Sequence, residues 1–96
     1  MNPRDREEKE KLNREKLASA ISTLDAIIKN RDIQRNTRNH VKDILGILKD
    51  EKSGGITVRA ANAVSVLDGL TQNRQMESYI RTMLWQVVST LESIRE

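Results

Sequence analysis

The chain has 96 residues and a formal net charge of +3, because 17 lysine and arginine side chains stand against 14 aspartate and glutamate side chains. Only 36% of the residues are hydrophobic, 2% are aromatic and none is cysteine. This length accommodates one small domain, and the lack of cysteine excludes disulfides and thiolate metal sites. No apolar stretch is long enough for a membrane span and the charged N-terminus is unlike a secretory signal, so we expect a cytoplasmic protein with no membrane partner.

The first sixteen residues are nearly all polar, and Leu12 is their only sizeable apolar side chain after Met1. Acids precede bases by four residues at several places, an order that supports helical ion pairs of about 0.2–0.5 kcal/mol each. Such a segment has too little apolar surface to join a core. We therefore predict a charged, frayed helical extension over residues 1–16, followed by a single bundle domain over residues 17–96.

From residue 17 onward, apolar side chains recur every three or four positions, which gives a helix one apolar face. The pattern predicts four helices that form two hairpins, over residues 17–50 and 57–95. The hairpin turns fall at residues 30–32 and 73–75, and Gly54-Gly55 interrupts the chain between the hairpins. Asn30 is expected to end the first helix in a left-handed conformation, and Thr57 to cap the third.

The two hairpins show nine identities at an offset of 43 residues, without a gap. They are Ala18, Ala20, Ser22, Leu24, Asp25, Asn30, Arg31, Arg38 and Leu48, which match Ala61, Ala63, Ser65, Leu67, Asp68, Asn73, Arg74, Arg81 and Leu91. The polar matches favour a duplication over chance similarity between amphipathic helices, and the unit has the length of HEAT-type repeats. The predicted fold is therefore an all-α, four-helix antiparallel bundle made of two duplicated hairpins.

Each predicted hairpin places an acid beside an arginine, because the two residues lie at similar distances on either side of the turn. Asp25 is expected to face Arg38, and Asp68 to face Arg81. Paired carboxylates could serve acid and base chemistry, but here each acid has its own cation and nothing brings the two acids together. We therefore predict one structural ion pair in each hairpin.

Few residues suit catalysis or metal binding. His40 is the only histidine, and no acidic cluster with the spacing of metal ligands accompanies it. The sequence also contains no phosphate-binding glycine loop and no serine in a strand-to-helix elbow. We expect no enzymatic activity, no metal and no cofactor.

Five basic residues on the second predicted helix fall within roughly 60° of one another at about 100° per residue. They are Arg31, Arg35, Arg38, Lys42 and Lys49. One interpretation is a stripe that contacts the phosphates of RNA or DNA in a salt-dependent manner. The other is a solvated flank whose long side chains cover apolar surface. No aromatic residue lies among these cations, so base stacking has little support.

Trp85 lies about 145° from the centre of the apolar face of the fourth helix, and Tyr79 lies at the edge of that face. Tryptophan and tyrosine are enriched at binding hot spots, and Arg81 stands one turn before Trp85 as a cation–π neighbour. These residues suggest an anchor for a homodimer or a protein partner. Alternatively, Trp85 is covered within the chain, with Leu12 as a contact.

Three segments resemble a small archaeal family known as uncharacterised protein family zero-one-four-seven. They are Val58-Arg59-Ala60-Ala61-Asn62-Ala63-Val64-Ser65-Val66-Leu67-Asp68, Arg35-Asn36-Thr37-Arg38 and Trp85-Gln86-Val87-Val88-Ser89-Thr90-Leu91-Glu92. The resemblance covers residues 17–94 and implies an archaeal source and an all-helical bundle. It implies no activity, because none is assigned to the family. The Val-Arg-x-Ala pattern is also similar to HEAT-type repeats, which favours protein binding by analogy.

Together these patterns predict a non-enzymatic interaction module. Our first hypothesis is self-association or protein binding through a face that includes Trp85, Tyr79 and Arg81. The alternative is electrostatic binding to RNA, DNA or the ribosome through the basic stripe of the second helix. The two hypotheses use different parts of the chain, because residues 17–52 carry a net charge of +2 whereas residues 53–96 carry none.

Overall fold

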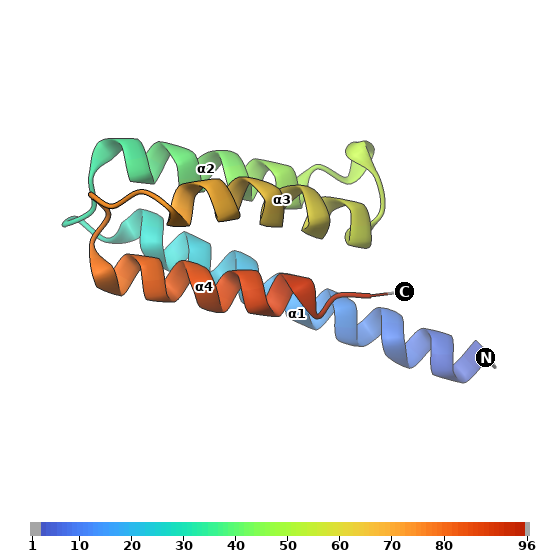
Figure 1. Ribbon diagram of the computed structural model, residues 1–96. Helices are drawn as coiled ribbons and strands as arrows, with labels where there is room; N and C mark the ends of the chain where they lie inside the picture. Colours follow the sequence, from blue (N-terminus) through green and yellow to red (C-terminus); the bar gives the residue numbers. More distant parts are fainter. Residues whose placement is uncertain (1–2, 96) are drawn as a thin grey trace.

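The computed structural model describes residues 3–95, which form four packed α-helices (Figure 1). They are α1 (Pro3–Lys29), α2 (Arg35–Lys49), α3 (Ile56–Thr71) and α4 (Ser78–Glu92), and the short 3-10 helix η1 (Glu51–Ser53) follows α2. Each helix packs against its two neighbours around the bundle, so that α1 and α3 both contact α2 and α4. The predicted all-α class and the four helices are confirmed. Residues 1 and 2 of the predicted extension, and residue 96 of the predicted domain, lie outside the described residues.

The core is formed by the helix faces that the apolar spacing predicts. Eight pairs of buried side chains lie 43 residues apart, one member in each hairpin. These pairs are Ala20 and Ala63, Leu24 and Leu67, Ile27 and Leu70, Ile33 and Met76, Thr37 and Ile80, Val41 and Leu84, Ile44 and Val87, and Leu48 and Leu91. Both hairpins thus present the same positions to one shared core, which buries apolar surface that neither hairpin would cover alone.

The predicted N-terminal extension is the beginning of α1, which runs without interruption from Pro3 to Lys29 and projects beyond the other helices (Figure 1). Its last turn is attached to the bundle. The side chain of Asn13 is buried, with 6% of its surface exposed, and its Nδ2 donates to the carbonyl oxygen of Arg95 at 2.8 Å. Lys16 Nζ donates to the carbonyl oxygen of Ser93 at 3.0 Å. Helix α1 therefore holds the C-terminal end of α4.

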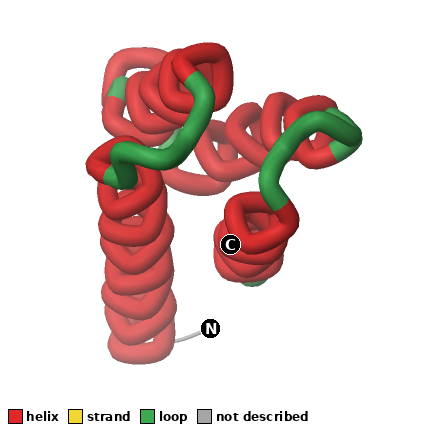
Figure 2. The backbone as a smooth tube through the Cα atoms, turned by 90° about the vertical axis from the view of Figure 1, so that its left-hand side faces the viewer, coloured by secondary structure: helices red, strands yellow, loops and turns green. Residues whose placement is uncertain are grey.

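The turns between α1 and α2 and between α3 and α4 lie side by side at one end of the bundle (Figure 2). In each turn an asparagine side chain accepts a hydrogen bond from the backbone N–H two residues later. Asn30 Oδ1 accepts from Asp32 at 2.9 Å, and Asn73 Oδ1 accepts from Gln75 at 3.0 Å. The left-handed conformation predicted for Asn30 is wrong, because no non-glycine residue of the described chain has a positive φ. Its side chain closes the turn instead.

The connection between the hairpins depends on Gly54. Its φ is +148°, a backbone conformation that residues other than glycine rarely adopt. A Cβ added at this position would lie 3.1 Å from Cγ1 of Val58. The next residue, Gly55, is the N-cap of α3. The predicted cap, Thr57, lies two residues later, inside the first turn of the helix. The backbone at the two glycines, rather than a side-chain cap, sets the start of α3.

A basic side chain of a neighbouring helix donates to a backbone carbonyl group at or just beyond the C-terminal end of each helix. In α2, α3 and α4 this side chain belongs to the fourth residue, and in α1 it belongs to Lys16, which lies 43 residues before Arg59. Arg38 donates to Ile28 O and Asn30 O, Arg59 to Leu48 O, Arg81 to Asn73 O, and Lys16 to Ser93 O. The last carbonyls of a helix have no partner within it and carry a partial negative charge, so a cation stabilises them.

The predicted ion pairs of Asp25 with Arg38 and of Asp68 with Arg81 are wrong. Asp25 Oδ2 lies 2.9 Å from Nζ of Lys29, one turn later in α1. Asp68 is exposed and takes part in no ion pair within the described chain. The two arginines instead donate to backbone carbonyl groups just beyond the helix ends, at Asn30 and at Asn73.

This correction gives a test by paired substitutions in the first hairpin. Arg38→Gln should lower the free energy of unfolding by about 1–2 kcal/mol, because a half-buried charged donor and its two carbonyl bonds are lost. Asp25→Asn should lower it by less than about 0.5 kcal/mol, because only an exposed ion pair within α1 is removed. Urea titrations followed by circular dichroism would measure both values. Equal losses of unfolding free energy in the two variants would indicate instead that an ion pair between Asp25 and Arg38 is the stabilising contact.

Candidate functional site

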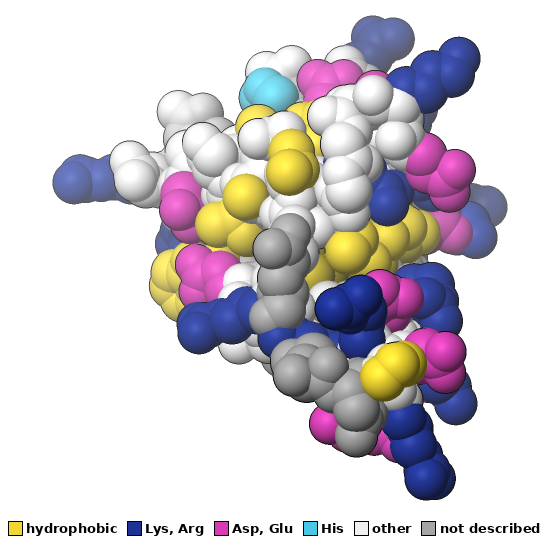
Figure 3. Space-filling model, turned by 90° about the vertical axis from the view of Figure 1, so that its right-hand side faces the viewer, with side chains coloured by type: hydrophobic (Ala, Val, Ile, Leu, Met, Phe, Trp, Pro, Cys, Tyr) yellow, Lys and Arg dark blue, Asp and Glu magenta, His cyan; other side chains and the backbone are white. Residues whose placement is uncertain are grey.

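The two hairpins differ strongly in surface charge. Helices α3 and α4 carry two charged side chains each, whereas α1 carries thirteen and α2 five. Four of the five large hydrophobic side chains that are exposed belong to the second hairpin, namely Val58, Val66, Tyr79 and Trp85; the fifth is Leu12. Figure 3, which faces the end of the bundle away from the hairpin turns, shows hydrophobic side chains at the surface with charged side chains around them. The molecule therefore has two chemically different surfaces.

Trp85 is the most exposed of these hydrophobic side chains, with 56% of its surface accessible. It points away from the buried face of α4, as its position on the helix predicts. Leu12 is 49% exposed, so the part of the chain that the structure describes leaves both side chains largely open to solvent. The interpretation that the chain itself covers Trp85 is therefore not supported.

Tyr79 and Arg81 do not join Trp85 in one patch. Tyr79 and Trp85 are six residues apart, which places them about 120° apart around α4. The hydroxyl of Tyr79 accepts a hydrogen bond from Asn30 Nδ2 at 3.1 Å, so this side chain leans toward the turn after α1. Arg81 donates to the carbonyl oxygen of Asn73 and is held at the end of α3. Trp85 is therefore the only one of the three without an internal polar contact among the described residues.

A shallow groove of about 350 Å³ lies between α3 and α4, on the same side of α4 as Trp85. It contains Glu92, which follows Trp85 by seven residues and therefore shares its face of the helix. The lining is largely apolar and consists of Thr57, Ala60, Ala61, Val64, Leu91, Glu92, Ile94 and Arg95. We call Trp85 and this groove the α3–α4 face.

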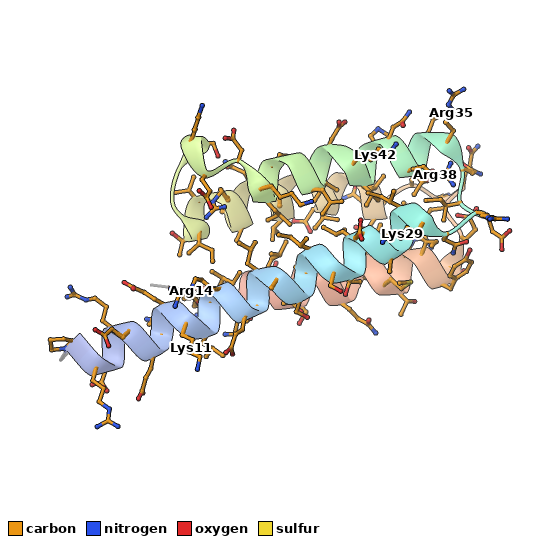
Figure 4. The ribbon with its side chains drawn as sticks, turned by 180° about the vertical axis from the view of Figure 1, so that it is seen from behind. Lys11, Arg14, Lys29, Arg35, Arg38 and Lys42 are labelled. Carbon is orange, nitrogen blue, oxygen red and sulfur yellow. The ribbon has the colours of Figure 1, made fainter. Side chains whose placement is uncertain are left out.

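The predicted basic stripe on α2 is present, but one member is not free. Arg31, Arg35, Lys42 and Lys49 are exposed, whereas Arg38 is half-buried and donates to two carbonyl groups. Figure 4 shows Arg35, Arg38 and Lys42 on the side of the molecule formed by α1 and α2, together with Lys11, Arg14 and Lys29 of α1. The sequence analysis missed these three residues of α1. Their positions were a usable signal, because Lys11, Arg14 and Lys29 project within about 60° of one another, on a flank that Ala18, Ser22 and Asp25 also occupy.

No group of three or more histidine, aspartate or glutamate side chains within residues 3–95 is placed to hold a metal ion. His40 is exposed at the edge of a groove of about 310 Å³ between α2 and α3, whose other lining residues are Val66, Gly69, Leu70 and Asn73. None of the described helices is long and apolar enough to cross a membrane.

These features define a small all-helical bundle protein with a charged surface on one hairpin and a nearly uncharged surface on the other. The chain belongs to the uncharacterised protein family UPF0147, whose family profile matches residues 4–94. This assignment confirms the resemblance inferred from the sequence, and no activity has been described for the family.

Relatives of this chain come from archaea. It is 38% identical over 84 residues to a UPF0147 protein of Aeropyrum pernix, an alignment that covers 88% of this chain and 91% of the relative. The crystal structure of the unknown-function protein MMP1188 matches with a TM-score of 0.79 and 31% identity, covering 84% of this chain and 91% of that chain. A family member from Thermoplasma acidophilum matches with a TM-score of 0.80 and 21% identity, covering 88% and 99%, which shows a shared fold.

Proposed function

We propose that this protein is a non-enzymatic interaction module that self-associates through the α3–α4 face, with Trp85 as the anchor. The observation that carries the proposal is an indole side chain, 56% exposed, on the part of the surface that is poorest in charge. The cores of protein interfaces are depleted in charged residues and enriched in tryptophan, tyrosine and arginine. Hot-spot residues are surrounded by further contact surface, and the groove between α3 and α4 offers such surface on the same side of α4.

Self-association also suits the small size of the domain. A chain of 96 residues buries a smaller fraction of its surface than a larger domain, so burial of Trp85 against a second copy would add apolar contacts that one core cannot supply. An isologous dimer would place Trp85 of each protomer near the symmetry axis or in the groove of its partner. Such an interface has few ion pairs and is expected to tolerate salt.

The test is sedimentation equilibrium of the wild type and of Trp85→Ala over a range of protein concentrations. We expect the wild type to shift from monomer to dimer as concentration rises, at both low and high salt. Loss of an indole anchor should weaken the dimer by about 2 kcal/mol or more, roughly a 30-fold rise in Kd. Because Trp85 is the only tryptophan, its fluorescence should move to shorter wavelength as the dimer forms.

Leu12→Ala is the matched control, because Leu12 is exposed to a similar degree but lies on the projecting part of α1. This variant should dimerise like the wild type. A wild type that remains monomeric at every concentration would rule out self-association. A dimer that Trp85→Ala leaves unchanged would move the interface away from the α3–α4 face.

We also infer that the two hairpins arose by duplication of one helical hairpin of HEAT-like length. Support comes from the nine identities at an offset of 43, from the eight buried pairs at the same offset, and from the matching asparagine turns. Replacement of residues 30–38 by the sequence of residues 73–81 should therefore preserve a cooperative thermal transition. A chain that no longer unfolds cooperatively after this exchange would contradict the equivalence of the two turns.

A further inference from the structure

We propose that the surface shared by α1 and α2 binds the phosphate backbone of a nucleic-acid duplex. The surface consists of two rows of cations, which we call the basic face. The row on α2 is Arg35, Lys42 and Lys49, and the row on α1 is Lys11, Arg14 and Lys29. This proposal concerns the opposite hairpin from the self-association proposed above and does not depend on it.

The row on α2 is regular. Its three members are separated by seven residues each, so they lie on one line along the helix at intervals of about 10.5 Å. All three are exposed, as are the three members on α1 (Figure 4). Six exposed cations in two rows form a positively charged surface that is larger than the stripe visible in the sequence of α2 alone.

Few acids counter these charges. Lys29 is paired with Asp25 at 2.9 Å. The described part of the chain places no carboxylate in an ion pair with Lys11, Arg14, Arg35, Lys42 or Lys49. Glu10 and Glu51 lie with Arg14 in a groove at one end of the face, and Asp25 neutralises Lys29 at the other end, so most of the unpaired positive charge lies on the α2 row. Five cations are therefore available to a ligand.

The spacing of the rows favours a duplex over a single strand. The axes of packed helices lie about 8–10 Å apart, so the long side chains of the two rows can reach across a duplex groove, which is about 6–12 Å wide. Cations on α1 and α2 can then contact the two phosphate backbones on either side of one groove. Single-strand binders instead stack bases on aromatic side chains, and the two aromatic residues of this chain, Tyr79 and Trp85, both belong to α4.

The hydrogen bonds of Arg38 distinguish it from the cations of the basic face. Its guanidinium is held by two carbonyl groups, so it orders the turn between the rows and is not counted as a ligand contact. By contrast, Lys42 and Lys49 make no hydrogen bond or ion pair within the described chain. Their charges can therefore be removed without loss of a structural contact, which makes them suitable for a binding test.

The experiment measures binding of the full chain to a fluorescent 20-base-pair RNA duplex, and to a DNA duplex of the same sequence, at 50 and 200 mM KCl. With five phosphate contacts, log K should fall with log salt with a slope of roughly −4 to −5, a loss of about 10²–10³-fold between these two conditions. Lys42→Gln/Lys49→Gln should reduce the slope by about 2. Circular dichroism should show an unchanged fold.

The matched control is Arg6→Gln/Arg74→Gln, which removes the same net charge from exposed positions outside both the basic face and the α3–α4 face. It should leave the slope unchanged. Binding of either duplex with these properties supports the proposal. The proposal is overturned if neither duplex binds at 50 mM KCl, or if the control variant lowers the slope as much as the lysine variant does. It is also overturned if the single strand binds as tightly as the duplex, or if the protein binds phosphatidylserine vesicles and not the duplexes.

Discussion

The structure depends on how the C-terminal ends of its helices are satisfied. At or just beyond the end of each helix, a backbone carbonyl group accepts a hydrogen bond from a basic side chain of a neighbouring helix. Apolar packing is not directional, so the core alone would allow neighbouring helices to slide. A slide of one turn, about 5.4 Å, would remove Arg38 from Asn30 or Arg59 from Leu48. These bonds therefore fix the register of a bundle whose core is small.

The same constraint shapes the surface. Of the four arginines in the second half of the chain, Arg59 and Arg81 are used at helix ends, and the remaining two lie in the turn and at the C-terminus. Helices α3 and α4 thus keep almost no free positive charge, and their outer side chains are small or apolar. The first hairpin has many more cations than the few that donate to carbonyl groups at the helix ends. The two hairpins therefore offer an apolar surface and a basic surface.

Much of the fold could be predicted, and the errors have one cause. Apolar spacing located the four helices, the buried faces and the outward position of Trp85, because each depends only on residues close in sequence. The polar partners were misassigned. Asp25 and Arg38 do lie on adjacent helices, but spacing does not reveal that Arg38 donates to carbonyl groups at the end of α1 while Asp25 pairs with Lys29. The cap by Thr57 failed similarly, because Gly54 and Gly55 set the backbone first.

By itself the sequence determined the helical class, the two hairpins, their common spacing of 43 residues and the family to which the chain belongs, because these are properties of local pattern. Only the tertiary structure decided which charged groups are free. Lys11 and Arg14 lie about thirty residues from Lys42 and Lys49 in the chain, and they share a surface because α1 packs against α2. Tyr79 and Trp85 are close in sequence, but the rotation of the α-helix points them in different directions. Tyr79 contacts Asn30, whereas Trp85 faces solvent.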